Sequence, residues 1–263
     1  MTQKITVCGG GNGSHAMAGD LSLRGYKVTL FEHPKFRQNI EKVLQTMTIE
    51  VVGEIEGTAN LEGVTVSPKE AVEDANTILL PIPTYAQEPF FDLMMPFFKE
   101  DQRVIMTTGN YGSIILGNFL NTRRNIQMVV GETSTLPYIA RMMGPGKVRV
   151  IKDQKKFFAS AFPAEHNQDV IQELDSLYKN VAIPTRDSVE TALNNLNPVA
   201  HPAGLLLNAG KIESAEIEGE DYYLYREGIS PSVARVIETV NAERLKTATA
   251  LGYSAKSLCE EDT

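Results

Sequence analysis

Near its N-terminus the chain reads Ile5-Thr6-Val7-Cys8-Gly9-Gly10-Gly11-Asn12-Gly13-Ser14, so a short apolar run leads directly into a glycine-rich turn. The residues that follow are compatible with a helix. A strand, a G-x-G-x-x-S turn and a helix in this order are typical of a dinucleotide-binding βα unit. Gly9 permits the tight turn, Gly11 lets a pyrophosphate approach the backbone, and the small Ser14 lets helix and strand pack closely. Asn12 and Gly13 begin the helix, whose free N–H groups favour phosphate.

An acidic residue stands where this type of fold places one. The second predicted strand, Lys27–Phe31, ends at Glu32, 21 residues after Gly11. A carboxylate at this position accepts hydrogen bonds from the adenosine ribose and repels a 2′-phosphate, so NAD(H) is the preferred cofactor. Lys35 and Arg37 follow closely and could bind such a phosphate, which keeps NADP(H) as the alternative.

Residues 1–185 alternate strand-like and helix-like segments, which predicts an α/β Rossmann-type domain with a mostly parallel sheet. The predicted strands are Lys4–Cys8, Lys27–Phe31, Thr77–Ile82, Arg103–Thr107 and Gln127–Gly131. Glycines interrupt Met47–Val66, which is expected to be a hairpin insertion before the next crossover. Three further runs are expected to extend or flank the sheet: Val148–Ile151, Phe157–Phe162 and Val181–Ile183.

Two loops after later strands are candidates for the nicotinamide side of the cofactor. Ligands of open α/β sheets bind beyond the carboxyl ends of the strands. Pro83 and Thr84 follow the strand that begins at Thr77, and Asn110 follows the strand that ends at Thr107. For each loop a purely structural turn is the alternative to cofactor contact.

The residue pattern changes after Pro184, because strand-like runs become rare. This predicts a smaller all-helical domain over residues 186–263. Ser188–Ile212 and Pro231–Leu251 are long and carry few strand signals. Ser230-Pro231-Ser232 is a helix start with proline in the first turn.

The composition fits an ordinary globular protein. The 263 residues are 42% hydrophobic and 22% charged, which excludes disordered and low-complexity classes. The net charge of −8 argues against nucleic-acid partners and anionic membrane surfaces, and no apolar run is long enough for a membrane span. Cys8 and Cys259 cannot build a disulfide framework, and no spacing predicts a metal site. We therefore expect a cytoplasmic protein without metal, acting on small molecules, with a homodimer left open.

The segment around His201 carries the candidate proton-transfer group. Asn197 precedes His201 by four residues, so on a helix both side chains share one face. An imidazole titrates near neutral pH and can exchange a proton while a hydride moves. A hydrogen-bonded structural histidine is the plainer alternative.

Three stretches together resemble the opine dehydrogenase family of the octopine/nopaline dehydrogenase type. They are Val7–His15, the run Gly131-Glu132-Thr133-Ser134-Thr135-Leu136-Pro137-Tyr138, and Asn197-Pro198-Val199-Ala200-His201-Pro202 with the following Leu206–Glu213. The resemblance implies a Rossmann domain and a helical domain. It also implies NAD(P)H-dependent reductive condensation of an α-keto acid with the amino group of an amino acid.

The resemblance also assigns roles to individual residues. His201 matches the family's catalytic general acid/base and Asn197 the asparagine that helps to hold substrate, while Thr135 falls near the keto-acid site. Members of the family continue beyond the position that matches Thr263. This implies that the helical domain is incomplete relative to the family and lacks the acidic partner of the histidine. Glu213, Glu216 and Glu227 are the nearby acids that could replace this partner.

Two other functions compete with this one. A two-domain ketone or alcohol reductase of the ketopantoate reductase or glycerol-3-phosphate dehydrogenase type would rely on a lysine, and Lys211 is the only one near His201. A nucleotide-binding module without turnover is the third hypothesis. Turnover that requires both a keto acid and an amino acid would separate the first hypothesis from both alternatives.

Overall fold

The computed structural model describes residues 3–153, 156–179 and 181–258. The chain forms two compact units, Met1–Ala192 and Leu193–Thr263, which are described separately below. Their boundary lies seven residues after the predicted one, inside the short helix α7 (Ser188–Leu193). The α/β class of the N-terminal part and the helical class of the C-terminal part are confirmed.

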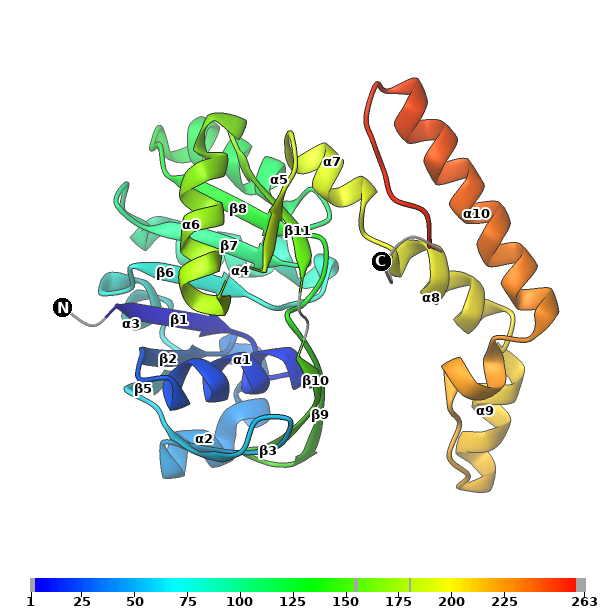
Figure 1. The fold of residues 1–263 in the computed structure, drawn as a ribbon. Coiled ribbons are helices and arrows are strands. Elements are labelled where there is room, and N and C mark those ends of the chain that lie inside the picture. The colour runs from blue at the N-terminus through cyan, green and yellow to red at the C-terminus, as the bar shows by residue number, and fades with distance from the viewer. Residues whose placement is uncertain (1–2, 154–155, 180, 259–263) are drawn as a thin grey trace. The chain divides into compact units, whose positions relative to one another are not determined.

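An eight-stranded sheet forms the centre of the first unit (Figure 1). Its order is β12-β11-β8-β7-β6-β1-β2-β5, and β1 lies between β2 and β6. The strand order therefore reverses at β1, which creates the crevice that ligands of this fold use. The bounds are β1 Lys4–Cys8, β2 Lys27–Phe31, β5 Gly63–Thr65, β6 Thr77–Leu80, β7 Arg103–Thr107, β8 Val129–Thr133, β11 Phe157–Phe162 and β12 Ala182–Pro184.

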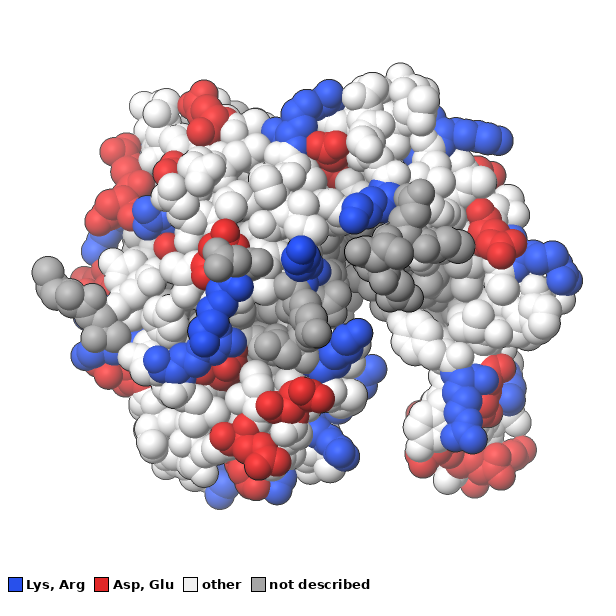
Figure 2. Space-filling view, in the orientation of Figure 1, with Lys and Arg blue, Asp and Glu red and all other residues white. Residues whose placement is uncertain are grey.

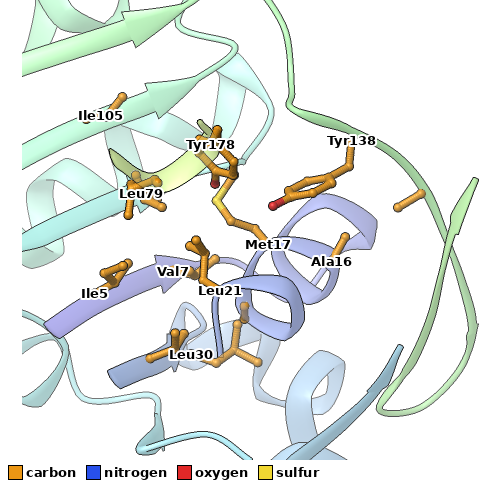
Figure 3. Close-up of a cluster of buried hydrophobic side chains, with 14 of the residues drawn as sticks. Ile5, Val7, Ala16, Met17, Leu21, Leu30, Leu79, Ile105, Tyr138 and Tyr178 are labelled. Carbon is orange, nitrogen blue, oxygen red and sulfur yellow. The ribbon is translucent and has the colours of Figure 1, made fainter. Parts of the chain in front are cut away.

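Helices cover both faces of this sheet (Figure 1). On one face, α1 (Asn12–Leu23) and α6 (Asn167–Tyr178) bury Met17, Leu21 and Leu174 against the strands, and Figure 3 shows part of this cluster. On the other face, α3 (Pro68–Glu73), α4 (Thr84–Met94) and α5 (Gly112–Phe119) bury a second cluster around Phe31 and Phe91. This two-sided cover explains why the central strands are continuously apolar.

A second, four-stranded sheet packs against α1. Its order is β4-β3-β10-β9, with β3 Thr48–Gly53, β4 Gly57–Asn60, β9 Tyr138–Gly144 and β10 Lys147–Asp153. The predicted hairpin is present as the antiparallel pair β3 and β4. The third strand of that segment, β5, instead joins the main sheet beside β2.

Three expectations about strands need correction. The run Val148–Ile151 does not extend the main sheet, because β10 pairs with β3 and β9 in the second sheet. The strand β9 was not predicted, since its sequence, Tyr138-Ile139-Ala140-Arg141-Met142-Met143-Gly144, does not alternate apolar and polar residues. The strand predicted at Gln127–Gly131 begins two residues later, at Val129.

The second unit contains α8 (Asn197–Leu206), α9 (Ala209–Glu218), the π-helical turn η5 (Leu224–Gly228) and α10 (Pro231–Ala250). The segment Ser188–Ile212, expected to be helical, is divided into α7, α8 and the start of α9. Pro198 lies in the first turn of α8, where the missing N–H of proline costs no hydrogen bond within the helix. A small core of Val199, Ala203, Val233 and Ile237 joins α8 to α10.

The charged, apolar, metal-ligating and cysteine residues add four observations. The acidic excess of the second unit gathers around the end of α9, where Glu216, Glu218, Glu220 and Asp221 are exposed (Figure 2). Within the described ranges, no helix combines the length and apolar character that crossing a membrane requires. The same residues include no cluster of histidine, cysteine and acidic side chains that could hold a metal ion. Cys8 is buried and unpaired, and Cys259 lies outside the described residues.

Candidate active site

The glycine loop between β1 and α1 has the geometry that its sequence requires. Gly9 has a φ of +91°, and a Cβ atom there would lie 2.8 Å from both Ile82 Cγ2 and Ser14 Oγ. Glycine is the residue that adopts this conformation without strain. Ser14 is buried, and its hydroxyl donates a hydrogen bond to the Cys8 carbonyl at 2.8 Å. The Ser14 side chain therefore ties the start of α1 to the end of β1.

The loop leaves room beside the helix N-terminus. No other atom lies within 4 Å of a Cβ built on Gly11, which is the N-cap residue of α1. The first-turn N–H groups of a helix have no partner within the helix, and together they favour an anion. Asn12 and Gly13 contribute two of these groups. The arrangement fits a pyrophosphate.

Glu32 lies directly against this loop. A Cβ on Gly10 would approach Glu32 Oε2 to 2.8 Å, although 21 residues separate Glu32 from Gly11 in the chain. The carboxylate is 3% exposed and accepts hydrogen bonds from the His33 N–H at 2.7 Å and from Asn39 Nδ2 at 3.0 Å. These hydrogen bonds hold the Glu32 carboxylate next to the phosphate loop. A ribose would lie there, and the carboxylate oxygens could accept hydrogen bonds from its hydroxyl groups.

Two more predicted cofactor residues contact each other at the same edge of the sheet. Asn110 Nδ2 donates to Thr84 Oγ1 at 3.1 Å, and Thr84 is the first residue of α4 after Pro83. The loop after β8, which contains Thr135, also reaches the phosphate loop, since Leu136 packs within 3.4 Å of a Cβ position on Gly13. The first unit thus brings the predicted residues of four separate segments to one edge of the sheet.

His15 and Asn12 connect the loop to its surroundings. The His15 side chain is buried, with Nδ1 3.1 Å from the Gly11 carbonyl. Burial lowers the pKa of its imidazole, and hydrogen bonds to the Gly11 and Gly10 backbone partly oppose this shift. Asn12 Oδ1 accepts the Met142 N–H at 2.7 Å, which attaches the unpredicted strand β9 to the phosphate loop.

The catalytic candidates lie in the second unit, on α8. Asn197 is the first residue of this helix and His201 follows one turn later, so both share a face as predicted. His201 Nε2 lies 2.5 Å from the Tyr225 hydroxyl, and the two rings meet edge to face. Within residues 193–258, none of Glu213, Glu216 and Glu227 is hydrogen-bonded to the imidazole. Glu227 instead pairs with Lys211 at 3.3 Å and accepts the Tyr223 N–H.

Sequence reasoning missed three residues that organise these two regions. Tyr225 follows His201 by 24 residues, and no local pattern links them. Asn208 donates to the carbonyls of Gly204 and Gly228, which explains an asparagine after the leucine run that ends α8. Glu132 is completely buried and accepts hydrogen bonds from Ser113 and Tyr111. An acidic residue within a buried apolar strand, β8, was the available signal for Glu132.

Comparison with known proteins identifies the family. The opine dehydrogenase of Arthrobacter sp. (strain 1C) is 30% identical over 261 residues, which cover 98% of this chain and 71% of that protein. The chain belongs to the opine dehydrogenase family. Residues 184–261 match the model of the NAD/NADP octopine/nopaline dehydrogenase α-helical domain. The vitopine synthase of Allorhizobium ampelinum is 29% identical and covers 97% of this chain and 70% of its own length.

Solved structures show the same fold. An octopine dehydrogenase with NADH and L-arginine has a TM-score of 0.72 at 22% identity, over 95% of this chain and 64% of its own. A yersinopine dehydrogenase with NADP⁺ has a TM-score of 0.77 at 16% identity, over 97% of this chain and 66% of its own. This opine dehydrogenase family member thus spans about two thirds of the solved structures. A ketopantoate reductase with a TM-score of 0.64 shares the fold, but the family assignment does not favour that alternative.

Opine dehydrogenases are NAD(P)-dependent oxidoreductases, so the predicted enzyme class and cofactor class are confirmed. The roles of individual site residues remain predictions.

Proposed function

We propose that this chain catalyses the NAD(P)H-dependent reductive condensation of an α-keto acid with the amino group of an amino acid. One observation carries the proposal: Glu32 lies against the glycine loop Gly9–Ser14, beside the open space at Gly11, in a member of the opine dehydrogenase family. The proposed assignment gives the first unit the cofactor and gives the second unit the catalytic and substrate-holding residues.

The residues of the first unit fit a nicotinamide dinucleotide, which supplies a hydride when it is bound. The first turn of α1 would hold the pyrophosphate, with Gly11 leaving the necessary space. Glu32 would accept the ribose hydroxyls. Pro83, Thr84 and Asn110 would border the nicotinamide.

NAD(H) is the proposed preference over NADP(H). Glu32 presents a carboxylate where a 2′-phosphate would lie, and like charges repel. Arg37, which could offset this repulsion, already pairs with Glu41 at 3.0 Å. Glu32→Ala is expected to weaken NADH binding more than NADPH binding. An unchanged ratio of the two dissociation constants would remove Glu32 from the ribose site.

His201 is the proposed general acid/base. Tyr225 holds Nε2 of its imidazole, which defines the orientation of the ring. Asn197 offers an amide on the same helical face, and in the first unit Thr135 precedes Leu136, which packs against the phosphate loop. Asn197 is the residue proposed to help hold substrate, and Thr135 is separately proposed to belong to the keto-acid site.

The deciding experiment follows NADH oxidation with pyruvate and a panel of amino acids, against pyruvate alone. Oxidation that requires both substrates is expected. Oxidation with pyruvate alone would favour a ketone reductase, and NADH binding without turnover would favour a nucleotide-binding module.

Two further expectations, on cellular location and on assembly, accompany the proposal. We propose a cytoplasmic enzyme that acts on small molecules, and a homodimer as its assembly. Light scattering of the purified chain measures the assembly directly, and a monomer mass would contradict the second of these.

A further inference from the structure

A carboxyl group whose described hydrogen-bond partners are all neutral is buried beneath the loop that follows β7. Glu132 is 0% exposed, and its described partners are neutral donors. The Ser113 N–H and the Tyr111 N–H donate to it at 3.0 and 3.3 Å, and the Ser113 hydroxyl lies 2.6 Å from Oε2. Burying an ionisable carboxyl group among neutral groups is unfavourable. Because this burial is unfavourable, we expect Glu132 to have a role that a neutral apolar side chain could not fill.

The loop above Glu132 is strained. Thr108, Asn110 and Tyr111 have φ values of +84°, +49° and +70°, a region that side chains other than glycine rarely adopt. Gly109 completes the loop, where a Cβ atom would meet Glu132 Cβ at 2.2 Å. Strained backbone of this kind persists only where its surroundings hold it, and it clusters at functional sites.

Side chains hold the loop from several directions. Gln87 Nε2 donates to the Thr108 and Gly109 carbonyls at 3.2 and 3.1 Å. Thr133 Oγ1 accepts the Thr108 N–H at 3.2 Å. Glu132 fixes the far end through Tyr111 and through Ser113 in the first turn of α5. Glu132 therefore joins the end of the loop to the start of α5.

The loop carries a residue of the proposed cofactor site. Asn110 lies at its tip and contacts Thr84 at the carboxyl edge of the sheet. The same polar cluster continues away from the loop, because Ser113 Oγ lies 2.7 Å from Ser188 Oγ in the first residue of α7.

We propose that Glu132 is a positioning residue that holds the loop Thr108–Tyr111 in its strained conformation and so presents Asn110 and Thr84 to the nicotinamide half of the cofactor. This inference rests on the proposed function, since it requires a nicotinamide dinucleotide at this edge of the sheet. Glu132 itself need not touch the cofactor, because its oxygens are already occupied by Tyr111 and Ser113.

The test compares the binding of two ligands that differ only in the presence of the nicotinamide. NADH carries the nicotinamide, whereas ADP-ribose lacks it and reports only on the phosphate loop and Glu32. Calorimetry on the wild-type chain, on Glu132→Gln and on the control Glu165→Gln gives both dissociation constants. Glu165 is an exposed acid in the same unit, and it pairs with His166. Glutamine keeps the volume of Glu132 and one acceptor oxygen.

In Glu132→Gln, the dissociation constant for NADH is expected to rise about 10- to 100-fold, because the glutamine NH₂ group accepts no hydrogen bond and leaves a buried N–H of the loop without its acceptor. The constant for ADP-ribose is expected to stay within about twofold, and Glu165→Gln to change neither. If Glu132→Gln fails to fold, Ser113→Ala removes one of the contacts, with an expected rise of about three- to tenfold for NADH alone.

Equal weakening of both ligands would make Glu132 merely structural and would overturn the inference. Unchanged binding of both ligands in Glu132→Gln would also overturn the inference. A wild-type chain that binds ADP-ribose as tightly as NADH would overturn it as well. A wild-type chain that binds neither ligand would instead contradict the proposed cofactor function itself, and the inference would fall with it.

Discussion

Two glycines of the phosphate loop serve different purposes. Gly9 has a left-handed backbone and close neighbours, whereas Gly11 has an ordinary φ of −89° and open space beside it. The first glycine is required by the fold, and the second is required by the proposed ligand. Substituting alanine at each position adds one methyl group and separates the effect on stability from the effect on NADH binding.

Gly9→Ala is expected to lower the free energy of unfolding by about 1–3 kcal/mol, because it forces an alanine into a strained conformation. Gly11→Ala is expected to cost less than about 1 kcal/mol in stability. Its dissociation constant for NADH should nevertheless rise by more than about tenfold, because the methyl group occupies the space of the pyrophosphate. Urea unfolding and calorimetry measure the two effects. Equal stability losses would contradict the distinction.

His201 is the residue on which the proposed chemistry depends. His201→Ala should leave the dissociation constant for NADH nearly unchanged and lower turnover by about 10²–10⁴-fold, as expected for loss of a general acid/base. His166→Ala is the matched control, since this partly exposed histidine belongs to the first unit and pairs with Asp169. A near-normal turnover in His201→Ala would exclude the assignment.

Glu132 makes stability depend on pH. Burial raises the pKa of its carboxyl group, and hydrogen bonds from Ser113 and Tyr111 only partly oppose this shift. The folded chain therefore keeps a proton that the unfolded chain loses above about pH 4.3. Its stabilising contribution is complete below that pH and is lost as the pH rises through the raised value.

Glu132→Gln has no such proton to lose, so wild-type stability should fall relative to this variant as the pH rises from about 4 to neutral. Urea unfolding of both proteins across this range is the measurement. Parallel curves would show that the carboxyl group does not titrate with a raised pKa.

At the scale of elements, β9 links the phosphate loop to the second sheet. Asn12 Oδ1 accepts the Met142 N–H at the start of α1, and β9 continues into the antiparallel pair with β10. The Tyr138 hydroxyl, at the other end of β9, is hydrogen-bonded to the buried Asp20 of α1. The second sheet is thus anchored to the helix that carries the proposed cofactor site.

Two substitutions of Asn12 are expected to separate anchoring from binding. Asn12→Ala removes the acceptor for Met142 and should cost about 0.5–1 kcal/mol of stability. Asn12→Asp keeps an acceptor oxygen but places a negative charge beside the pyrophosphate, so NADH affinity should fall by about tenfold or more while stability is retained. Thermal unfolding and calorimetry distinguish the two variants. Retained NADH affinity in Asn12→Asp would place the phosphates elsewhere.

At the scale of the whole molecule, the two units differ in the size of their cores. The first unit buries two large apolar clusters on either side of its sheet. The described core of the second unit consists of Val199, Ala203, Val233 and Ile237. Local stability follows buried apolar contact, so the second unit should open more readily.

Hydrogen exchange tests this difference. Amides in α8 and α10 are expected to exchange at least about tenfold faster than those in β1, β6 and β7, which corresponds to a difference of about 1.4 kcal/mol in the free energy of opening. Added NADH should slow exchange around Gly9–Ser14 if the first unit binds it. Identical protection in all five elements would show that the chain opens as one cooperative unit.

Much of the first unit could be predicted from contiguous residues. The strand, the glycine turn and the spacing to Glu32 are local properties, because a left-handed turn demands glycine and a buried parallel strand demands an apolar run. The sequence by itself therefore determined the central parallel strands, the edge of the sheet proposed to bind the cofactor, and the shared face of Asn197 and His201.

Only the tertiary structure decided the rest. The pairing of β3 with β10, the hydrogen bond between His201 and Tyr225, and the burial of Glu132 beneath a strained loop all join residues that are distant in the chain or that lack a local pattern. Strand pairing and side-chain contacts between such segments depend on the packing of several elements at once. A short window of sequence records the preferences of each segment, and it does not record which partner each one meets.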